Sequence, residues 1–560
     1  MSRLAPRNPE SGSGSGSSSG SGSRSGSRSG SGSGNGHREA ERLARGGALN
    51  LIGAIVSGLA NLALVVVATR SLGVDDAGRF FTVTSAFLVL QTVARLGADL
   101  GLVYFLARFR ALGQGNRVGA CLRAAFVPVV GMAVLLGGGL ALAAGPLARW
   151  TVGGDDGGVV TMLRLLAVLL PVAAGYDLLL GITRGYSRMR PTVVLEKIGR
   201  PTTQLLAMIA VAATGAGPVA LGAAWALPYL PFAVLALRAA RRALPGALKT
   251  GTDKAAETAP ETAAETDDVD GRSVAVAFWR FTAPRSVASW AQILLQRLDI
   301  VIVAAIRGPG DAALYAAATR FLVAGQLGNQ AISTAVQPRL SALLARKDLI
   351  GAGGLYQVST AWLVSISWPI FGLAAAFAPW LLGVFGDGYE RGENVVVLLS
   401  GAMLVATACG VVSIVLIMAG KTVWNLWNTL LALVLNIGLD LLLVPSYGIF
   451  GAGIGWAAAV LAGNLVPLVQ VWRSIGLHPF GAATRASMAL SGLCFCALPV
   501  TVRLLVGDTF GGFLLAAAVG TAVYVAAAWQ FRNVLHLDSL RALGRLRGQK
   551  TDVELTGGTA

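Results

Sequence analysis

The stretch SVASWAQILLQRLDIVIVAAIRG, from Ser286 to Gly308, has the length and apolar character of a helix that crosses a membrane. About 20 mostly apolar residues are enough for a helix to span the hydrocarbon core. Arg297 and Asp299 nevertheless lie within this stretch, and Arg285 directly precedes it. A charged side chain in a spanning helix is costly against lipid, so we expect these charges to face protein or water.

Apolar runs of similar length recur along almost the whole chain. Of its 560 residues, 54% are hydrophobic and 13% are charged, whereas soluble proteins carry about 25% charged residues. The runs are too long and too uniformly apolar for barrel strands. We therefore predict an all-α polytopic membrane protein with about 14 transmembrane helices. The predicted spans are residues 47–69, 79–106, 119–144, 159–181, 192–214, 217–237, 279–306, 312–337, 358–384, 394–419, 423–444, 450–472, 486–506 and 510–531.

The charges of the connections predict how the chain is oriented. Lys and Arg gather in alternate connections, such as 184–200 and 238–242, while the intervening connections, such as 153–158, are short and neutral or acidic. Cytoplasmic connections carry the basic excess in membrane proteins. We therefore expect a multi-pass protein of the cytoplasmic (inner or plasma) membrane with both termini cytoplasmic. The net charge of +17 is explained in this way, and no nucleic-acid partner is expected.

The sequence contains an internal repeat. At an offset of 235 residues, Gly73 corresponds to Gly308 and Asp76 to Asp311, and polar positions of the first span correspond to polar positions of the seventh. Because six spans separate the copies, both have the same orientation, and they form two parallel six-helix repeats. Repeated halves with a substrate site at their interface are typical of secondary transporters.

The repeat and the polar segments predict the domain boundaries. We expect a disordered Ser/Gly-rich cytoplasmic tail with a basic lead-in at 1–45, a six-helix bundle at 46–240, a disordered cytoplasmic linker at 241–274, a second six-helix bundle at 275–474, two additional transmembrane helices at 475–532, and a basic cytoplasmic tail at 533–560.

Polar residues recur at helical spacing within several spans. The candidate cavity-lining positions on the seventh span are Arg285, Ser289, Gln292, Gln296 and Asp299, with Asn61 on the first span, Arg95 on the second and Gln330 on the eighth. Residues three and four apart share one helix face, and lipid cannot satisfy such a face. We predict a hydrated, partly cationic cavity lined by spans 1, 2, 7 and 8. The alternative is that the amides only hydrogen-bond neighbouring helices.

Two further arginines belong to the candidate substrate-binding residues. Arg297 lies about 120° away from the seventh-span stripe, where it lines the cavity edge or pairs with another helix. Arg320 is a further candidate cation of the eighth span, unless it extends toward the outer interface. Arg95 has a simpler alternative in a pair with Asp99, four residues on.

The sequence contains no pattern of an enzyme active site. The three histidines are dispersed, so neither a metal site nor a catalytic triad is indicated, and we expect no cofactor. GKT at 420–422 lacks the first glycine of a phosphate-binding loop. No outward connection is long enough for a conventional catalytic site, which argues against a membrane glycosyltransferase or polymerase.

Three stretches resemble one known family. LGVDDAGRFFTVTSAF (72–87), LGADLGL (96–102) and AGKTVWNLWNTLLALVLNIGLDLLLVPSYGIFGAGIGWAAA (419–459) are similar to polysaccharide-biosynthesis membrane proteins, the O-antigen-type lipid-linked oligosaccharide flippases of the multidrug/oligosaccharidyl-lipid/polysaccharide exporter superfamily. The resemblance covers roughly residues 45–530. It implies two six-helix bundles that form a V around a cavity, and transport of undecaprenyl-pyrophosphate-linked sugars between the leaflets.

The resemblance leaves related functions open. A cation-coupled multidrug exporter of the same superfamily needs membrane-embedded acids, for which Asp99, Asp177, Asp299 and Asp440 are candidates. A lipid II-type flippase is the other alternative. The expected partners are the lipid-linked oligosaccharide, the bilayer, and glycosyltransferases or a polymerase of the same pathway.

Overall fold

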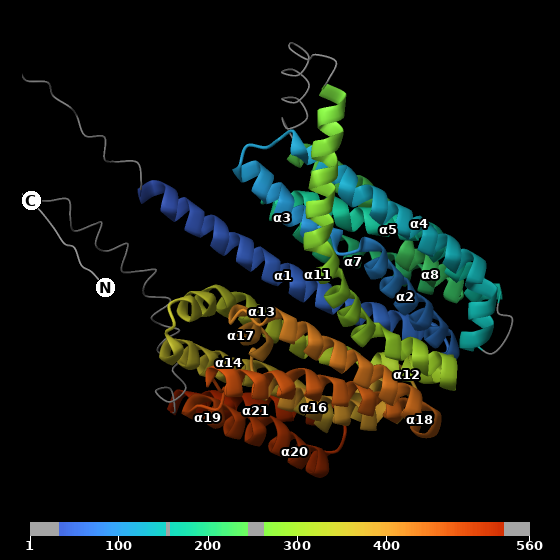
Figure 1. Cartoon of the computed structure of the whole chain (residues 1–560). Helices are drawn as coiled ribbons and strands as arrows, with labels where there is room; N and C mark the ends of the chain where they lie inside the picture. The colour runs from blue at the N-terminus through green and yellow to red at the C-terminus, as the bar shows by residue number, and fades with distance from the viewer. Residues whose placement is uncertain (1–32, 153–156, 245–262, 531–560) are drawn as a thin grey trace, which may run out of the picture. The chain divides into compact units, whose positions relative to one another are not determined.

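A computed structural model describes residues 33–152, 157–244 and 263–530, and within these ranges it is helical without strands. Leu49–Ala560 forms one compact unit and Met1–Ala48 another. Within Met1–Ala48, the structure describes residues 33–48, which begin helix α1 (Ser33–Ser71). The all-α prediction is confirmed, whereas most of the predicted tails at 1–45 and 533–560 and of the linker lies outside the described residues (Figure 1).

Every predicted span overlaps a helix. The helices of the first half are α1 (Ser33–Ser71), α2 (Val74–Arg95), α3 (Ala98–Ala111), α4 (Arg117–Val152), α5 (Gly157–Gly185), α6 (Met189–Pro191), the π-helix η1 (Thr192–Gly199), α7 (Arg200–Ala212), α8 (Pro218–Ala226) and α9 (Tyr229–Ala243). Those of the second half are α11 (Ala263–Arg307), α12 (Pro309–Ala318), α13 (Arg320–Ala345), α14 (Leu349–Ala376), α15 (Ala378–Gly383), the 3-10 helix η2 (Tyr389–Gly392), α16 (Glu393–Ala408), α17 (Val412–Met418), α18 (Thr422–Ile475), α19 (Ala482–Gly492), the π-helix η3 (Leu493–Ala497), α20 (Leu498–Val506) and α21 (Phe510–Gln530).

Eleven helical segments of the described residues are long and apolar enough to cross a membrane. The predicted spans at 192–214 and 312–337 fall on helices outside these eleven, and α18 covers two predicted spans in 54 residues. The multi-pass character is therefore confirmed, while the number fourteen stays a prediction.

Helix α18 is a hairpin of two arms. Gly448 interrupts its helical backbone with φ 56° and ψ −138°, a left-handed φ that glycine adopts at little cost. Beyond Gly448 the chain reverses direction. Contacts between the two arms show this reversal: Asn428 and Gln470 exchange side-chain hydrogen bonds of 2.7 and 3.0 Å, and a Cβ built at Gly463 lies 3.7 Å from that of Ala432. Both predicted spans, 423–444 and 450–472, are thus present as antiparallel arms.

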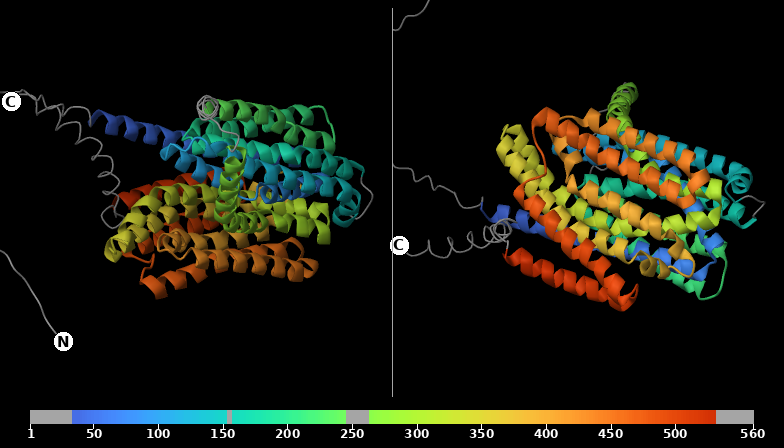
Figure 2. Two further views of the ribbon diagram at one scale, coloured as in Figure 1. Left: turned by 45° about the horizontal axis from the view of Figure 1, so that its top comes forward. Right: turned by 90° about the horizontal axis from the view of Figure 1, so that it is seen from below.

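The long helices pack side by side around an apolar core. Helices α4 and α5 lie against each other in all three views (Figures 1 and 2). Helix α19 packs against α14, and so do η3 and α20, so the segment predicted as two additional helices covers one face of α14. Fully buried aromatic side chains, among them Phe87, Tyr176 and Tyr315, fill the interior.

Helix α11 contacts both halves of the chain. It begins at Ala263, inside the predicted linker 241–274, so helix replaces the predicted disorder in the last part of that segment. Trp279 donates a hydrogen bond of 3.1 Å to the Ala124 carbonyl of α4, and Ser286 donates one to the Leu96 carbonyl beside α3. Both contacts lie within the predicted span 279–306 and join α11 to the first half of the chain.

The two halves also meet where α2 and α12 begin. Gly73 and Gly308 precede these two helices, as the repeat predicts. Gly78 of α2 lies so close to the Pro309 carbonyl that a Cβ there would overlap it. Near this contact, the Arg70 guanidinium donates hydrogen bonds of 2.8 Å to the carbonyls of Gly383 and Val384.

We expect a Gly78→Leu variant to separate α2 from α12, since an overpacked contact costs about 1–3 kcal/mol. The measurement is the disulfide yield between cysteines at Val74 and Gly310, where a Cβ at Gly310 lies 3.7 Å from Val74 Cγ1. Gly73→Leu is the matched control, because a Cβ there has no neighbour within 4 Å. Equal yields in the two variants would show that the α2–α12 contact does not depend on Gly78.

Candidate functional site

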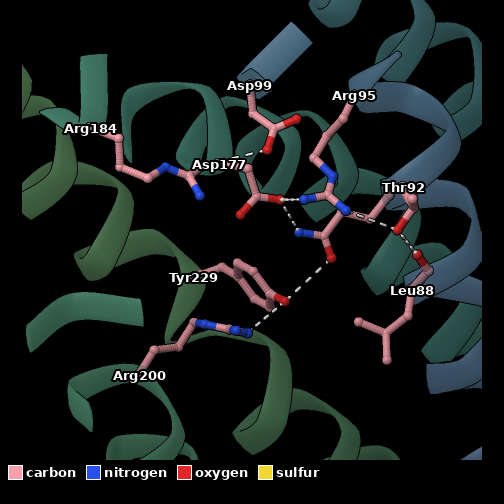
Figure 3. Close-up of polar contacts among 9 residues, drawn as sticks. Leu88, Thr92, Arg95, Asp99, Asp177, Arg184, Arg200 and Tyr229 are labelled. Carbon is pink, nitrogen blue, oxygen red and sulfur yellow. Dashed lines mark hydrogen bonds and ion pairs between the residues drawn. The ribbon is translucent and has the colours of Figure 1, made fainter. Parts of the chain in front are cut away.

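A largely buried cluster of arginines and carboxylates lies among α2, α3, α5, α7 and α9 (Figure 3). Asp177 of α5 accepts a hydrogen bond of 2.8 Å from the Gln91 amide and forms an ion pair of 3.4 Å with Arg95, both on α2. Asp99 of α3 pairs with Arg184 of α5, also at 3.4 Å. We call these residues, together with Arg200 and Tyr229, the arginine–carboxylate cluster.

Arg200 completes this cluster and has no hydrogen bond to a carboxylate of the described residues. It donates a hydrogen bond of 2.7 Å to the Tyr229 hydroxyl, and its guanidinium lies 4.6 Å from the centre of that ring. Glu196 on the π-helix η1 acts electrostatically on Arg95, Arg184 and Arg200. The cluster therefore brings three arginines and three acids together, and their formal charges balance.

Arg95 is a part of this interior network. The alternative of a pair with Asp99 is not what the structure shows, because the ion pairs of Arg95 and Asp99 cross between helices to Asp177 and Arg184. A side-chain exposure of 28% leaves part of Arg95 accessible. A cavity-lining role for Arg95 stays a prediction.

A second polar cluster lies among α11, α12 and α18. The Tyr315 hydroxyl donates a hydrogen bond of 2.6 Å to Asp299, and the Asn436 amide donates one of 3.4 Å to Asp440. Oδ1 of Asn436 and Oδ1 of Asp440 are buried without a hydrogen-bond donor. A Cβ at Gly455 would overlap Asp440 Oδ1, so glycine at this position makes room for the carboxylate.

Carboxylate and amide oxygens are the ligands that hard cations prefer, so the second cluster has the chemistry for a cation. No group of three or more His, Cys, Asp or Glu side chains with the arrangement of a metal site occurs in the described residues. The cluster offers two carboxylates and one amide.

Asp299 differs from the other members of the seventh-span stripe. Arg285, Gln292 and Gln296 are exposed, whereas Asp299 is 2% exposed. A straight α-helix drifts about 20° per heptad, so Asp299 is only about 40° from Arg285 around α11, and it is buried because Tyr315 of α12 packs on it and donates a hydrogen bond to its carboxylate. The exposed part of the stripe therefore ends before Asp299, which points into the protein.

Arg297 and Arg320 form a pair of cations beside Asp299. Their charges act on each other, and Asp299 acts on both. Arg320 donates a hydrogen bond of 3.0 Å to the Ala316 carbonyl of its own helical turn. Arg297 makes no hydrogen bond or ion pair with another described residue, and Asp299, whose charge acts on it, is already bonded to Tyr315. We call these two residues the arginine pair.

The predicted amides are exposed on their helices. Asn61 hydrogen-bonds to Ser57 of its own helix at 2.7 Å, while the side chains of Gln292, Gln296 and Gln330 make no hydrogen bond with a described residue. Interhelical hydrogen bonding, the alternative for these amides, is thus not found. Lipid cannot satisfy them, so they need water or a polar ligand.

Arg285 is exposed and held on its own helix. Its guanidinium donates a hydrogen bond of 2.8 Å to the Phe281 carbonyl and lies 3.8 Å from the centre of the Phe281 ring. Tyr104 of α3 stacks on that ring at 4.2 Å. Arg285 is thus separate from the arginine pair, which lies three turns further along α11.

Sequence reasoning missed several partners of these clusters. Tyr229 and Tyr315 gave no signal, because they lie singly in apolar segments far from the residues that they contact, and Glu196 and Arg200 belong to the basic connection 184–200, which was interpreted as cytoplasmic. Asp177 and Asp440 stood out as acids within apolar runs, and that isolation is the signal that marks buried polar clusters in spanning helices.

Two solved structures of superfamily transporters have the same fold. The lipid II flippase MurJ, in an inward closed conformation, aligns with a TM-score of 0.65 and 12% identity, over 86% of this chain and 99% of that one. An inward-facing multidrug resistance MATE family transporter aligns with a TM-score of 0.57 and 15% identity, over 78% of this chain and 96% of that one. Among curated proteins, no sequence matches the chain.

The helices and clusters define a multi-pass membrane protein with the fold of transporters of that superfamily. A family model described as polysaccharide biosynthesis protein matches residues 43–344, more than half of the chain. The chain belongs to this polysaccharide biosynthesis family, as the resemblance in its sequence predicted.

Proposed function

We propose that the chain is a flippase for undecaprenyl-pyrophosphate-linked oligosaccharide or polysaccharide precursors, which it moves across the cytoplasmic membrane by alternating access. The observation that carries the proposal is the arginine pair, two cations whose charges act on each other and that form no ion pair with a described residue, inside a protein of this family. The proposal needs no catalytic residue and no cofactor.

The arginine pair suits a pyrophosphate. Two nearby positive charges repel each other in a medium of low dielectric constant, and an anion placed between them removes the repulsion. Arginine binds phosphate through two parallel N–H···O bonds, which are charge-assisted and stronger than bonds between neutral groups. Arg297 and Arg320 would therefore hold the pyrophosphate head of a lipid-linked sugar.

The exposed amides suit the sugar. Gln292 and Gln296 lie on α11 within two turns of Arg297, and Asn61 and Gln330 belong to α1 and α13. Amides offer donors and acceptors to sugar hydroxyls. We infer that these four residues and Arg285 line a hydrated path for the glycan, with the arginine pair at its pyrophosphate end and Arg95 and Asp299 adjoining it from the two interior clusters.

The contact between the halves supports alternating access. Gly78 against Pro309, and Arg70 on the carbonyls of Gly383 and Val384, join the two halves at one end of the bundle. Backbone acceptors and one glycine contact are broken at modest cost, so these contacts can open while the halves remain folded. We place this end outside the cell, with both termini cytoplasmic, and expect glycosyltransferases or a polymerase of the same pathway as neighbours.

Transport in proteoliposomes tests the proposal. Purified protein is reconstituted with fluorescent undecaprenyl-pyrophosphate-linked oligosaccharide, and a membrane-impermeant reagent measures how much substrate reaches the other leaflet. We expect the substrate to become accessible at a rate that follows protein content. Protein that is folded, as judged by size-exclusion chromatography, but leaves the substrate inaccessible would overturn the proposal.

We expect Arg285→Ala to lower this transport about threefold and to leave membrane insertion intact. The effect is modest because exposed cation–π and ionic contacts contribute about 0.5–1 kcal/mol. Arg280→Ala is the control, since Arg280 is exposed on the same helix and lies outside the predicted stripe. Equal transport by the two variants would remove Arg285 from the path.

The second cluster favours a second candidate, a cation-coupled exporter of the same superfamily. Its buried acceptor oxygens on Asn436 and Asp440 are suited to a proton or a hard cation. Drug efflux driven by a sodium or proton gradient, without transport of lipid-linked sugar, would establish this alternative. Transport of lipid II in preference to other lipid-linked sugars would identify a lipid II-type flippase.

A further inference from the structure

An apolar groove separates α2, α4 and α5 from α11, and neither polar cluster uses it. Its volume is about 370 Å³. Ala86 of α2, Gly139 and Ala143 of α4, and Leu298 and Val301 of α11 are among the residues that line it. The groove is thus built from helices of both halves of the chain.

The lining of the groove has no free polar group. Thr82 is its one polar lining residue, and the Thr82 hydroxyl already donates a hydrogen bond of 2.8 Å to the Gly78 carbonyl. A buried water needs two to four polar partners, and apolar cavities stay dry and take apolar guests. The chemistry of the groove is therefore that of a hydrocarbon site.

The groove opens sideways on α4. Leu135 is 68% exposed, and Gly139 and Ala143 follow it at steps of one helical turn on the same face, both exposed. A Cβ built at Gly139 has no neighbour within 4 Å. Since the flank of a spanning helix borders the bilayer, a lipid chain can enter here without crossing a polar surface.

The arginine pair lies at the same depth as the groove. Leu298 directly follows Arg297, and consecutive helical residues differ by 1.5 Å in height and about 100° in direction. Leu298 and Val301 face the groove, while the charge of Arg297 acts on Arg320 and Asp299. One short segment of α11 therefore presents hydrocarbon on one face and positive charge on another, which complements a lipid with an anionic head.

We propose that this groove holds the isoprene units next to the pyrophosphate of a polyprenyl lipid, while the arginine pair holds the pyrophosphate. The inference rests on the proposed function, which supplies the class of lipid. A cavity of about 150 Å³ holds one benzene-sized guest, so the groove has room for roughly two or three isoprene units. Ala86, Gly139 and Ala143 leave notches along the wall that suit the methyl branches of such a chain, which a straight acyl chain lacks.

Photo-crosslinking with farnesyl pyrophosphate tests the groove. This probe has three isoprene units, and a diazirine is placed in the second. With the full-length protein in nanodiscs, we expect labelled peptides from α2, α4 and α11. We also expect competition by unlabelled farnesyl pyrophosphate at concentrations at least tenfold lower than by inorganic pyrophosphate.

Two neighbouring glycines provide matched variants. Gly139→Phe fills the groove, and we expect it to reduce labelling at least tenfold and to leave the affinity for inorganic pyrophosphate unchanged. Gly138→Phe adds the same side chain one residue away, where a Cβ also has no neighbour within 4 Å and which does not line the groove. We expect this control to label like the wild type.

Three results overturn the inference: labelling confined to other helices, equal competition by farnesyl and inorganic pyrophosphate, or equal labelling of the two phenylalanine variants. A phosphatidate that carries a diazirine is the lipid control. If it labels the groove as strongly as the farnesyl probe and loses this labelling in Gly139→Phe, the groove accepts any membrane lipid and is not selective for polyprenyl chains, which also overturns the inference. The proposed function is tested by a different readout: if farnesyl pyrophosphate labels the groove but lipid-linked sugar is not transported, the proposed function fails while the lipid site stands.

Discussion

An Arg320→Ala variant is expected to move pyrophosphate-linked sugar about ten- to a hundredfold more slowly than the wild type. A hydrogen bond to a charged group contributes about 1.5–3 kcal/mol, and a factor of ten corresponds to 1.36 kcal/mol. Arg297→Ala should have an effect of similar size. Arg320→Lys should lose less, because lysine keeps the charge and lacks the planar pair of donors. The measurement is the initial rate in the proteoliposome assay.

The stability of the same variant separates binding from folding. Arg297 and Arg320 repel each other, so removing one guanidinium relieves repulsion in the empty protein. We therefore expect the thermal midpoint of Arg320→Ala in detergent to equal or exceed that of the wild type while transport falls. Arg339→Ala, an exposed position on the same helix, is the control. A lowered midpoint that accounts for the loss of transport would make Arg320 a structural residue.

The helices were predictable because each apolar run carries its own signal. The run 510–531, for example, falls on α21 (Phe510–Gln530) almost residue for residue, since a spanning segment must satisfy its backbone internally. Helix α11 is the exception. Its first turns, from Ala263, are polar and precede its apolar run, so no hydropathy signal marks them.

The polar interior was less predictable than the fold. The repeat places Val412 opposite Asp177 and Leu64 opposite Asp299, so neither cluster has a copy in the other half. Helical periodicity identified Arg95 and Asp299 as polar residues within apolar spans. Their partners lie on other helices, and which side chains those helices turn toward Arg95 and Asp299 depends on how the helices pack. The two halves share an architecture and differ in interior chemistry, which makes separate roles for the two clusters testable.

Replacing either Asp177 or Arg95 by leucine is expected to destabilise the protein by about 3 kcal/mol. Removing one member of a buried ion pair leaves the other charge uncompensated, at a cost of about 3–5 kcal/mol; the 28% exposure of the Arg95 side chain places our value at the lower limit. The double variant Arg95→Leu/Asp177→Leu should recover most of the loss, because no charge of the pair remains unpaired. The thermal midpoint in detergent is the measurement.

The ion pair between Arg503 and Glu393 is the control for this cycle. Its nitrogen–oxygen distance is 3.0 Å, but its side chains are 31% and 36% exposed, and such pairs contribute about 0–1 kcal/mol. Its single variants should therefore shift the midpoint little. If Asp177→Leu lowers the thermal midpoint no more than replacing Glu393 does, Arg95 and Asp177 are not a buried, coupled ion pair.

Transport by the double variant then decides what the arginine–carboxylate cluster does. If the ion pair only stabilises the first half, the double variant, whose stability is restored, transports at nearly the wild-type rate. If Arg95 also meets the substrate from its accessible side, stability returns and transport does not. Because Arg200 and Tyr229 remain in place and still hydrogen-bond to each other, the cycle changes one charge pair and leaves the rest of the cluster intact. The rate of the double variant therefore measures the functional contribution of Arg95 apart from its structural one.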